Sequence, residues 1–264
     1  MKLNKYIRLY KSMFKLNIKS LMAYNFDFII GIIAMLVKTL INFSILLILF
    51  SLVSDIKGRT FNEMLFLYGF STASFGIWHS FFINTLTIPS YIKTGEFDRF
   101  LTKPYNPLFL ILIEGFDDDG RSQLILGIVI SLIAIVRLEL FTPLLLLLPF
   151  LRIITSFIYA GISILLSTIS FFTINNADIT NFTIQMNEFA KYPLTIYNDF
   201  FRFIFTVILP IGFASYYPSL IYLRGYTAFN IGSLLFTIFY SLIFFALSIF
   251  IWIKCLKRYT SSGF

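Results

Sequence analysis

The sequence predicts an all-α integral membrane protein with six transmembrane helices, on three observations. Residues 28–54 contain one acidic or basic side chain, Lys38. Residues 64–92 contain no Asp, Glu, Lys or Arg and one histidine, His79. Each stretch exceeds the roughly 20 apolar residues that cross a bilayer. In addition, 58% of the 264 residues are hydrophobic and only 13% are charged, whereas a soluble domain carries about a quarter charged residues. A soluble fold is therefore excluded.

The predicted spans follow the apolar runs along the chain. The third run is short, so its flanking Arg121 and Arg137 are expected to extend toward the two interfaces. The fifth run is interrupted by Pro210, Gly212 and Pro218, and non-helical backbone is tolerated at membrane depth only where protein or water covers it. The predicted spans are residues 28–54, 64–90, 122–136, 144–174, a fifth that ends at 203–209, and 226–253, with a re-entrant or extracellular hairpin at 210–223.

Lysine and arginine residues are distributed unevenly between the spans. If both termini of the single transmembrane domain, 1–264, are cytoplasmic, fifteen Lys and Arg residues lie inside and four outside, while Lys38 and Arg152 lie within spans. Cytoplasmic segments carry an excess of Lys and Arg, so this orientation is favoured. The same bias accounts for the net charge of +8, and no nucleic-acid partner is expected.

The first 21 residues predict an amphipathic helix that lies in the cytoplasmic interface. At 100° per residue, basic and apolar side chains fall on opposite sides. We expect one apolar face both to bind membrane lipid and to pack against neighbouring spans. The basic anchors are Lys5, Arg8, Lys11, Lys15 and Lys19, and the apolar face contains Leu3, Ile7, Tyr10, Phe14, Ile18 and Leu21.

Residues 91–121 form the largest predicted cytoplasmic loop, and its first part, 91–103, combines charges of both signs with aromatic side chains. Exposed aromatic residues indicate a contact surface, so we favour a partner-binding surface over a solvated loop. Its candidate residues are Tyr91, Lys93, Glu96, Phe97, Asp98, Arg99 and Phe100. The acidic run at 117–119 is interpreted as a solvated turn in preference to a divalent-cation site, and the second cytoplasmic loop, 175–201, as solvated.

Polar side chains at predicted membrane depth are candidates for the lining of a transport pathway. An ionised group there costs several kcal/mol unless it is paired or hydrated. Lys38 is expected to line a cavity or to have a structural partner, and His79, with Asn84 nearby, either contacts substrate or, as we favour, is a neutral histidine bonded between helices. Arg152 has no assigned role. One cysteine, Cys255, and one histidine predict neither a metal site nor a catalytic centre.

Three local patterns resemble the permease subunits of type-2 ABC exporters, in a bacterial branch of that family. They are KTGEFDRFLTKP at 93–104 with Asn106-Pro107 after it, Tyr192-Pro193 followed by FTVILPIGFASYYP at 205–218, and the tail from Trp252 to Gly263. Their order and spacing agree with the family along essentially the whole chain.

The resemblance implies a permease of the bacterial cell membrane that is not an enzyme itself. ATP and Mg²⁺ would bind a separate peripheral ATPase, and the sequence contains no Gly-x-x-x-x-Gly-Lys-Ser/Thr loop. Residues 91–101 would be the coupling helix, with Glu96, Asp98 and Arg99 making charged contacts and Phe97 and Phe100 as anchors. Residues 1–21 would be the elbow helix beside it. A second permease, identical or homologous, would complete the pathway against the first, second and fifth spans.

Two other classes of membrane protein are considered. A secondary transporter or channel without an ATPase partner is expected to have acidic residues within the spans and internal repeats, and the sequence shows neither convincingly. A membrane-embedded enzyme acting on lipids needs clustered His, Asp, Glu or Cys residues. One histidine and the acidic run at 117–119 give that class little support.

Overall fold

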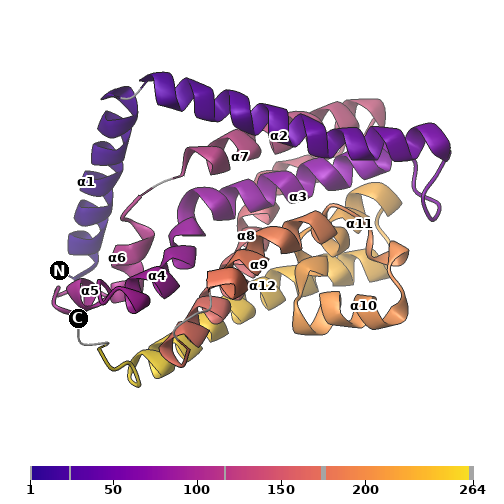
Figure 1. Ribbon diagram of the computed structural model, residues 1–264. Helices are drawn as coiled ribbons and strands as arrows, with labels where there is room; N and C mark the ends of the chain where they lie inside the picture. Colours follow the sequence, from indigo (N-terminus) through magenta and orange to yellow (C-terminus); the bar gives the residue numbers. More distant parts are fainter. Residues whose placement is uncertain (1, 24, 116, 174–176, 262–264) are drawn as a thin grey trace.

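The computed structural model describes residues 2–23, 25–115, 117–173 and 177–261, and every regular element in them is helical. Five long helices run beside one another, and the start of α1 (Lys2–Ala23) and the end of α12 lie at the same end of the molecule (Figure 1). The long helices are α2 (Asn25–Leu52), α3 (Phe61–Phe82), α7 (Asp118–Arg137), α8 (Leu148–Thr168) and α12 (Ala228–Leu256). They correspond to the predicted first, second, third, fourth and sixth spans.

Three helical segments of the described residues are long and apolar enough to cross a membrane. They are Asp119–Arg137, Pro143–Phe171 and Ala228–Leu256. The second consists of α8 extended by the short 3₁₀ helices η2 (Pro143–Leu147) and η3 (Ile169–Phe171). The all-helical membrane fold is thus confirmed, while the number of six crossings stays a prediction.

Capping side chains fix where several long helices begin. At the start of α3, the Glu63 N–H donates to Thr60 Oγ1 at 3.4 Å and the Thr60 N–H donates to Glu63 Oε2 at 3.1 Å. The side chains of Asp117 and Thr227 accept from backbone N–H groups at the starts of α7 and α12. These bonds satisfy donors that have no partner within the helix.

Helices α3 and α7 approach each other closely because glycines face one another. Gly69 and Gly76 on α3, like Gly120 and Gly127 on α7, are seven residues apart and so share one face of their helix. A Cβ at Gly127 would lie 2.3 Å from the backbone nitrogen of Ala73. Small residues allow the backbones of membrane helices to approach and gain van der Waals contact.

Buried side-chain hydrogen bonds join α3 to α8. Such bonds between membrane helices contribute about 0.6–2 kcal/mol each, and they fix the rotation of one helix against the other. They run from Trp78 Nε1 to Ser163 Oγ at 3.1 Å, from Thr155 Oγ1 to Ser74 Oγ at 3.0 Å, and between the hydroxyls of Ser71 and Tyr159 at 3.4 Å.

Helix α9 (Ala177–Ala190) occupies residues that the sequence assigned to a solvated loop. It packs against α3 and α8, with Thr183, Met186 and Asn187 buried. The prediction for 175–201 is therefore wrong over this face of α9, because Thr183 and Asn187 face other helices, while Asn181, Gln185 and Glu188 are exposed. Residues 175 and 176 lie outside the described part.

The predicted fifth span is also placed differently. The helix that ends at 208 consists of α10 (Asp199–Phe203) and a π-helical turn, η5 (Ile204–Ile208), of five residues each, which is too short to cross a bilayer. The chain then breaks at Pro210 before η6 (Ile211–Ala214) and α11 (Tyr216–Arg224). These segments, with η4 (Leu194–Ile196) before them, lie at the end of the molecule opposite the termini (Figure 1). The break agrees with the predicted hairpin, whose depth in the membrane stays a prediction.

Candidate functional site

The 91–103 segment begins in the second half of the short helix α4 (Ile88–Lys93), contains α5 (Asp98–Leu101) and ends before α6 (Pro107–Leu112). A 3₁₀ helix, η1 (Ile83–Thr87), connects it to α3. Gly95 turns the chain between α4 and α5 with a φ of 76°, a left-handed conformation that glycine adopts without strain. This turn directs α5 back toward the ends of α8 and α12.

Phe97 and Phe100 point into the protein. Their side chains are 0% and 2% exposed, in a cluster that includes Trp252 of α12. The Phe97 ring centroid lies 4.9 Å from that of Tyr259 and 5.7 Å from that of Phe171. The prediction of two exposed aromatic anchors is therefore wrong. Instead, burial of these rings fixes the 91–103 segment to the ends of α8 and α12.

The outer face of the segment is charged. Lys93, Glu96 and Arg99 are exposed, and Arg99 pairs with Glu114 at 2.5 Å and more loosely with Glu96 at 3.9 Å. The Tyr91 hydroxyl donates to Glu114 at 2.8 Å, and burial together with this carboxylate raises the pKa of Tyr91. The segment thus presents both signs of charge outward, while their contact with a partner stays a prediction.

Asp98 faces the C-terminal tail of the same chain. Its carboxylate accepts hydrogen bonds from the Tyr259 hydroxyl at 2.9 Å and from Ser261 Oγ at 2.5 Å. Burial and the neighbouring carboxylate raise the pKa of Tyr259 to about 12, so the phenol keeps its proton and donates at neutral pH. Asp98 therefore holds the tail onto the segment. Residues 262–264 lie outside the described part.

Helix α1 also packs on the 91–103 segment and α6. The Asn106 N–H donates to the Tyr6 hydroxyl at 3.2 Å, and the Tyr6 ring meets Tyr105 edge-on at 5.3 Å between centroids. Leu9 and Met13 join the cluster around Phe97. The predicted elbow helix is thus in contact with the predicted coupling segment.

The exposed apolar residues of α1 form a face beside the one that packs on α6. Ile7, Phe14 and Ile18 are exposed, and all five predicted anchors are exposed as well: Lys5, Arg8, Lys11, Lys15 and Lys19. Of the predicted face, Tyr10 packs on the protein together with Leu9 and Met13, whereas Ile7 and Ile18 are exposed. The prediction that the same residues both pack and anchor is therefore correct only for Tyr10. Met1 and the side chains of Leu3 and Leu21 lie outside the described part.

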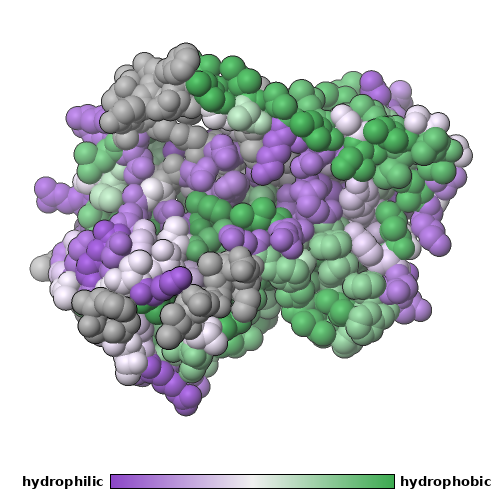
Figure 2. All heavy atoms as spheres, in the orientation of Figure 1, coloured by the Kyte–Doolittle hydropathy of each residue, from purple (hydrophilic) through white to green (hydrophobic). Residues whose placement is uncertain are grey.

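A polar pocket of about 40 Å³ lies between α2, α3, α7 and α9, which is room for a water molecule. Figure 2 shows hydrophilic atoms gathered in the middle of the viewed face, between hydrophobic atoms of α2 and those of the lower helices. The buried Tyr68 hydroxyl and Thr72 Oγ1 have no hydrogen-bond partner among the described residues. The polar lining includes Lys38, Asn42, Tyr68, Thr72, Glu188 and Lys191.

Lys191 and Glu188 give this pocket a charged pair that the sequence analysis missed. Lys191 Nζ lies 2.6 Å from Glu188 Oε1, with the lysine side chain 5% exposed and the glutamate 54%. Lys38 lines the same pocket and is exposed. The pair was not predicted because residues 175–201 were assigned to a solvated loop. The i, i+3 spacing of Glu188 and Lys191 is nevertheless typical of an ion pair on a helix.

Removing the charge of Glu188 should destabilise the protein, because it leaves the buried Lys191 without its counter-charge. Loss of one partner of a fully buried pair costs about 3–5 kcal/mol; since Glu188 is half exposed, we expect about 1–2 kcal/mol for Glu188→Gln. Thermal unfolding in detergent would measure the effect. Asp199→Asn is the matched control, because Asp199 pairs with Arg202 at 3.1 Å but is 97% exposed. Glu188→Gln with Lys191→Met should recover stability; failure to recover would contradict the pairing.

His79 and Asn84 lie apart from the lining of this pocket. His79 Nε2 is 3.6 Å from Asp117 Oδ2, and Asn84 Nδ2 donates to the Gly115 carbonyl at 2.7 Å. Both side chains connect the end of α3 and η1 to the chain that enters α7. The structure therefore brings Lys38 together with Glu188 and Lys191, and not with His79 or Asn84. Asp117 of the acidic run serves as the cap of α7.

Comparison with known proteins extends over almost the whole chain. A family model described as ABC-2 family transporter protein matches residues 12–263. No curated protein and no solved structure matches the chain. The matched range includes the 91–103 segment and every residue that lines the polar pocket.

Proposed function

The chain belongs to the ABC-2 transporter family, and from this premise we propose that it is the permease subunit of an ATP-driven exporter of the bacterial cell membrane. The match over residues 12–263 carries the proposal. As a member of this family the chain is an integral membrane protein and a transport component, with ATPase activity on a separate protein. That ATPase would hold ATP and Mg²⁺, since this sequence has no phosphate-binding Gly-x-x-x-x-Gly-Lys-Ser/Thr loop.

The exposed surface of α2 supports the proposal that two permeases form a pair. Large hydrophobic side chains are exposed along it, among them Ile33, Leu40 and Ile48, and Lys38 is exposed beside the polar pocket. A lysine that faces hydrocarbon costs several kcal/mol. A second permease packed against α2 would instead enclose Lys38 and the polar pocket in a hydrated pathway on the symmetry axis.

In the proposed topology α9 is the fifth crossing. It starts after η3, at the end of the molecule that holds the termini, and leads to α10 and α11 at the opposite end (Figure 1). Its 14 residues rise about 21 Å, less than the roughly 30 Å of hydrocarbon, so water must reach one of its ends. In this topology Lys191 and Arg202 are counted with the extracellular segments instead of the cytoplasmic ones. Thirteen Lys and Arg residues inside against six outside still favour cytoplasmic termini.

The ATPase is proposed to dock on the charged outer face of the 91–103 segment, with α1 beside it. Exchanging the exposed charges by Lys93→Glu with Glu96→Lys leaves the buried rings and the Arg99–Glu114 pair intact. Because charge complementarity steers and orients such contacts, we expect the affinity for the ATPase to fall by about tenfold or more. Copurification with the proteins of neighbouring genes, followed by an ATPase assay, would measure it.

Two results would contradict this proposal in different ways. The control Asp199→Lys changes an exposed charge at the opposite end and should bind the ATPase as wild type does. If the exchanged variant also binds like wild type, the docking surface lies elsewhere. If no ATPase copurifies with the unaltered chain, the exporter proposal fails and a transporter without an ATPase becomes the alternative.

A further inference from the structure

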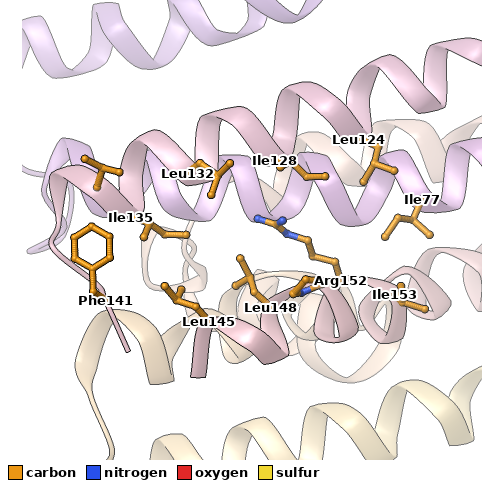
Figure 3. Close-up of a pocket in the computed structure, with 12 residues that line it drawn as sticks. Ile77, Leu124, Ile128, Leu132, Ile135, Phe141, Leu145, Leu148, Arg152 and Ile153 are labelled. Atoms are coloured by element: carbon orange, nitrogen blue, oxygen red, sulfur yellow. The ribbon is translucent and has the colours of Figure 1, made fainter. Parts of the chain in front are cut away.

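A groove of about 520 Å³ lies between α7 and α8 (Figure 3). Aliphatic side chains of both helices line it, and Arg152 is the one charged residue among its lining residues. Figure 3 shows Arg152 leaving α8 and pointing into the gap toward α7. The volume falls within the roughly 300–1,000 Å³ of small-molecule sites.

Arg152 lacks a counter-charge. Its side chain is 5% exposed, one terminal nitrogen donates to Ser131 Oγ, and its buried Nε–H has no acceptor among the described residues. No carboxylate in the described part of the chain forms an ion pair with it. A guanidinium has five N–H donors, and a buried charge without a partner is unfavourable by several kcal/mol. The guanidinium carbon of Arg152 lies 5.9 Å from the centroid of the Phe70 ring, a contact that is weaker than an ion pair. An anion in the groove would supply the counter-charge.

The lining of the groove restricts how that anion arrives. Leu132, Val136 and Phe141 form an exposed apolar rim that faces hydrocarbon in a membrane protein. A free inorganic ion would have to cross this rim without water, whereas an anion attached to an acyl chain enters from the bilayer itself. We propose that the α7–α8 groove binds an anionic phospholipid of the surrounding membrane, with its phosphate on Arg152 and one acyl chain along α7.

The dimensions of the groove suit this occupant. Arg152 lies four residues into α8 and nine residues into the apolar segment that begins at Pro143, and in Figure 3 its guanidinium leans toward the end of the groove at Phe141. A long basic side chain within a span extends toward the nearer headgroups in this way. Arg152 contacts Ser131 of α7, and from there back to Leu124 the apolar stripe of α7 extends about 10 Å, which accommodates the first part of an acyl chain. Planar guanidinium also matches phosphate geometry.

A second groove supplies an internal comparison. It lies between α2, α7 and the start of α3, has a volume of about 420 Å³, and is likewise lined by apolar residues with one arginine, Arg137. Arg137 is exposed at the last residue of α7, so water can solvate it and no lipid phosphate is required. Of the two grooves, only the one at Arg152 should distinguish anionic from zwitterionic lipid.

Native mass spectrometry of the full chain in mild detergent tests the proposal, with phosphatidylglycerol and phosphatidylcholine of identical acyl chains. We expect wild type to bind phosphatidylglycerol about tenfold more tightly, the equivalent of one charge-assisted hydrogen bond. Arg152→Gln should remove this preference, Arg152→Lys should keep part of it because lysine binds phosphate as a point charge, and Arg137→Gln should leave it unchanged.

A second variant tests the groove independently, in case Arg152→Gln does not fold. Ile128→Trp fills the groove while the arginine itself is kept, and should abolish the preference as well. Equal binding of the two lipids by wild type, or an undiminished preference in either Arg152→Gln or Ile128→Trp, would overturn the proposal. Release of the bound anionic lipid by ATP turnover in the complete transporter would also overturn it, since the groove would then hold cargo rather than a membrane lipid.

Discussion

Gly127→Ala should lower the free energy of unfolding by about 3 kcal/mol, the upper part of the range for overpacked cores. The added methyl group would lie 2.3 Å from the backbone nitrogen of Ala73, 2.7 Å from its Cα and 2.8 Å from the Gly69 carbonyl oxygen. These are backbone atoms, so no side-chain rotation relieves the clash and α3 must move away from α7. At about 2–4 °C for each kcal/mol, the unfolding midpoint in detergent should fall by about 6–12 °C.

Gly232→Ala is the matched control for this prediction. Gly232 also lies in a long helix, α12, but a Cβ there would meet no heavy atom within 4 Å. Alanine has a higher helix propensity than glycine by about 1 kcal/mol, so the control should be neutral or stabilising. If both variants unfolded at the wild-type temperature, α3 and α7 would not be in the close contact that the structure shows.

The long helices were predictable because their signal is continuous. The apolar run at 226–253 is flanked by polar residues and appears as α12 (Ala228–Leu256), and the run at 122–136 lies within α7. The close approach of α3 to α7 was not predicted. The glycines at 69, 76, 120 and 127 have the right spacing, but spacing within one helix does not identify the second helix that it meets.

Helix α9 was missed for a different physical reason. Its polar residues indicate a solvated segment when hydropathy is averaged along the chain, yet Asn187 and Thr183 are buried against other helices. The ion pair with Glu188 stabilises the charged form of the buried Lys191, which follows α9 directly. In sequence, a helix that lines a polar pocket in a membrane domain therefore looks like a solvated loop. Only the three-dimensional arrangement, in which this helix lies beside Lys38, distinguishes the two.

The direction of side chains in the 91–103 segment was not predictable either. Charges and aromatic rings alternate there, and the sequence does not say which side is covered. The covering groups, Trp252 and Tyr259, lie about 160 residues further along the chain, so no local pattern reveals them. The exposed charges of Lys93, Glu96 and Arg99 agree with the predicted contact surface. The rings of Phe97 and Phe100 point into the protein, although they were predicted to point outward.

Phe97→Ala should release the 91–103 segment from the ends of α8 and α12. Truncating a fully buried phenylalanine costs about 3–5 kcal/mol, and Phe97 is 0% exposed, with rings of Tyr259, Phe171 and Trp252 around it. Exposed trypsin sites at Lys93 and Arg99 lie on the same segment. When cleavage requires local opening, its rate follows the population of the open state, so we expect a rise of about a hundredfold to a few thousandfold.

The controls for this variant separate packing from general damage. Phe97→Leu conserves most of the volume and should cost less than about 1.5 kcal/mol, while Phe200→Ala removes an exposed ring and should leave the cleavage rate unchanged. Equal cleavage of Phe97→Ala and wild type would show that the buried rings do not hold the segment. If the segment is also where the ATPase docks, Phe97→Ala should bind the ATPase yet lose stimulation of its activity, because a segment detached from α12 no longer moves that helix when the ATPase closes.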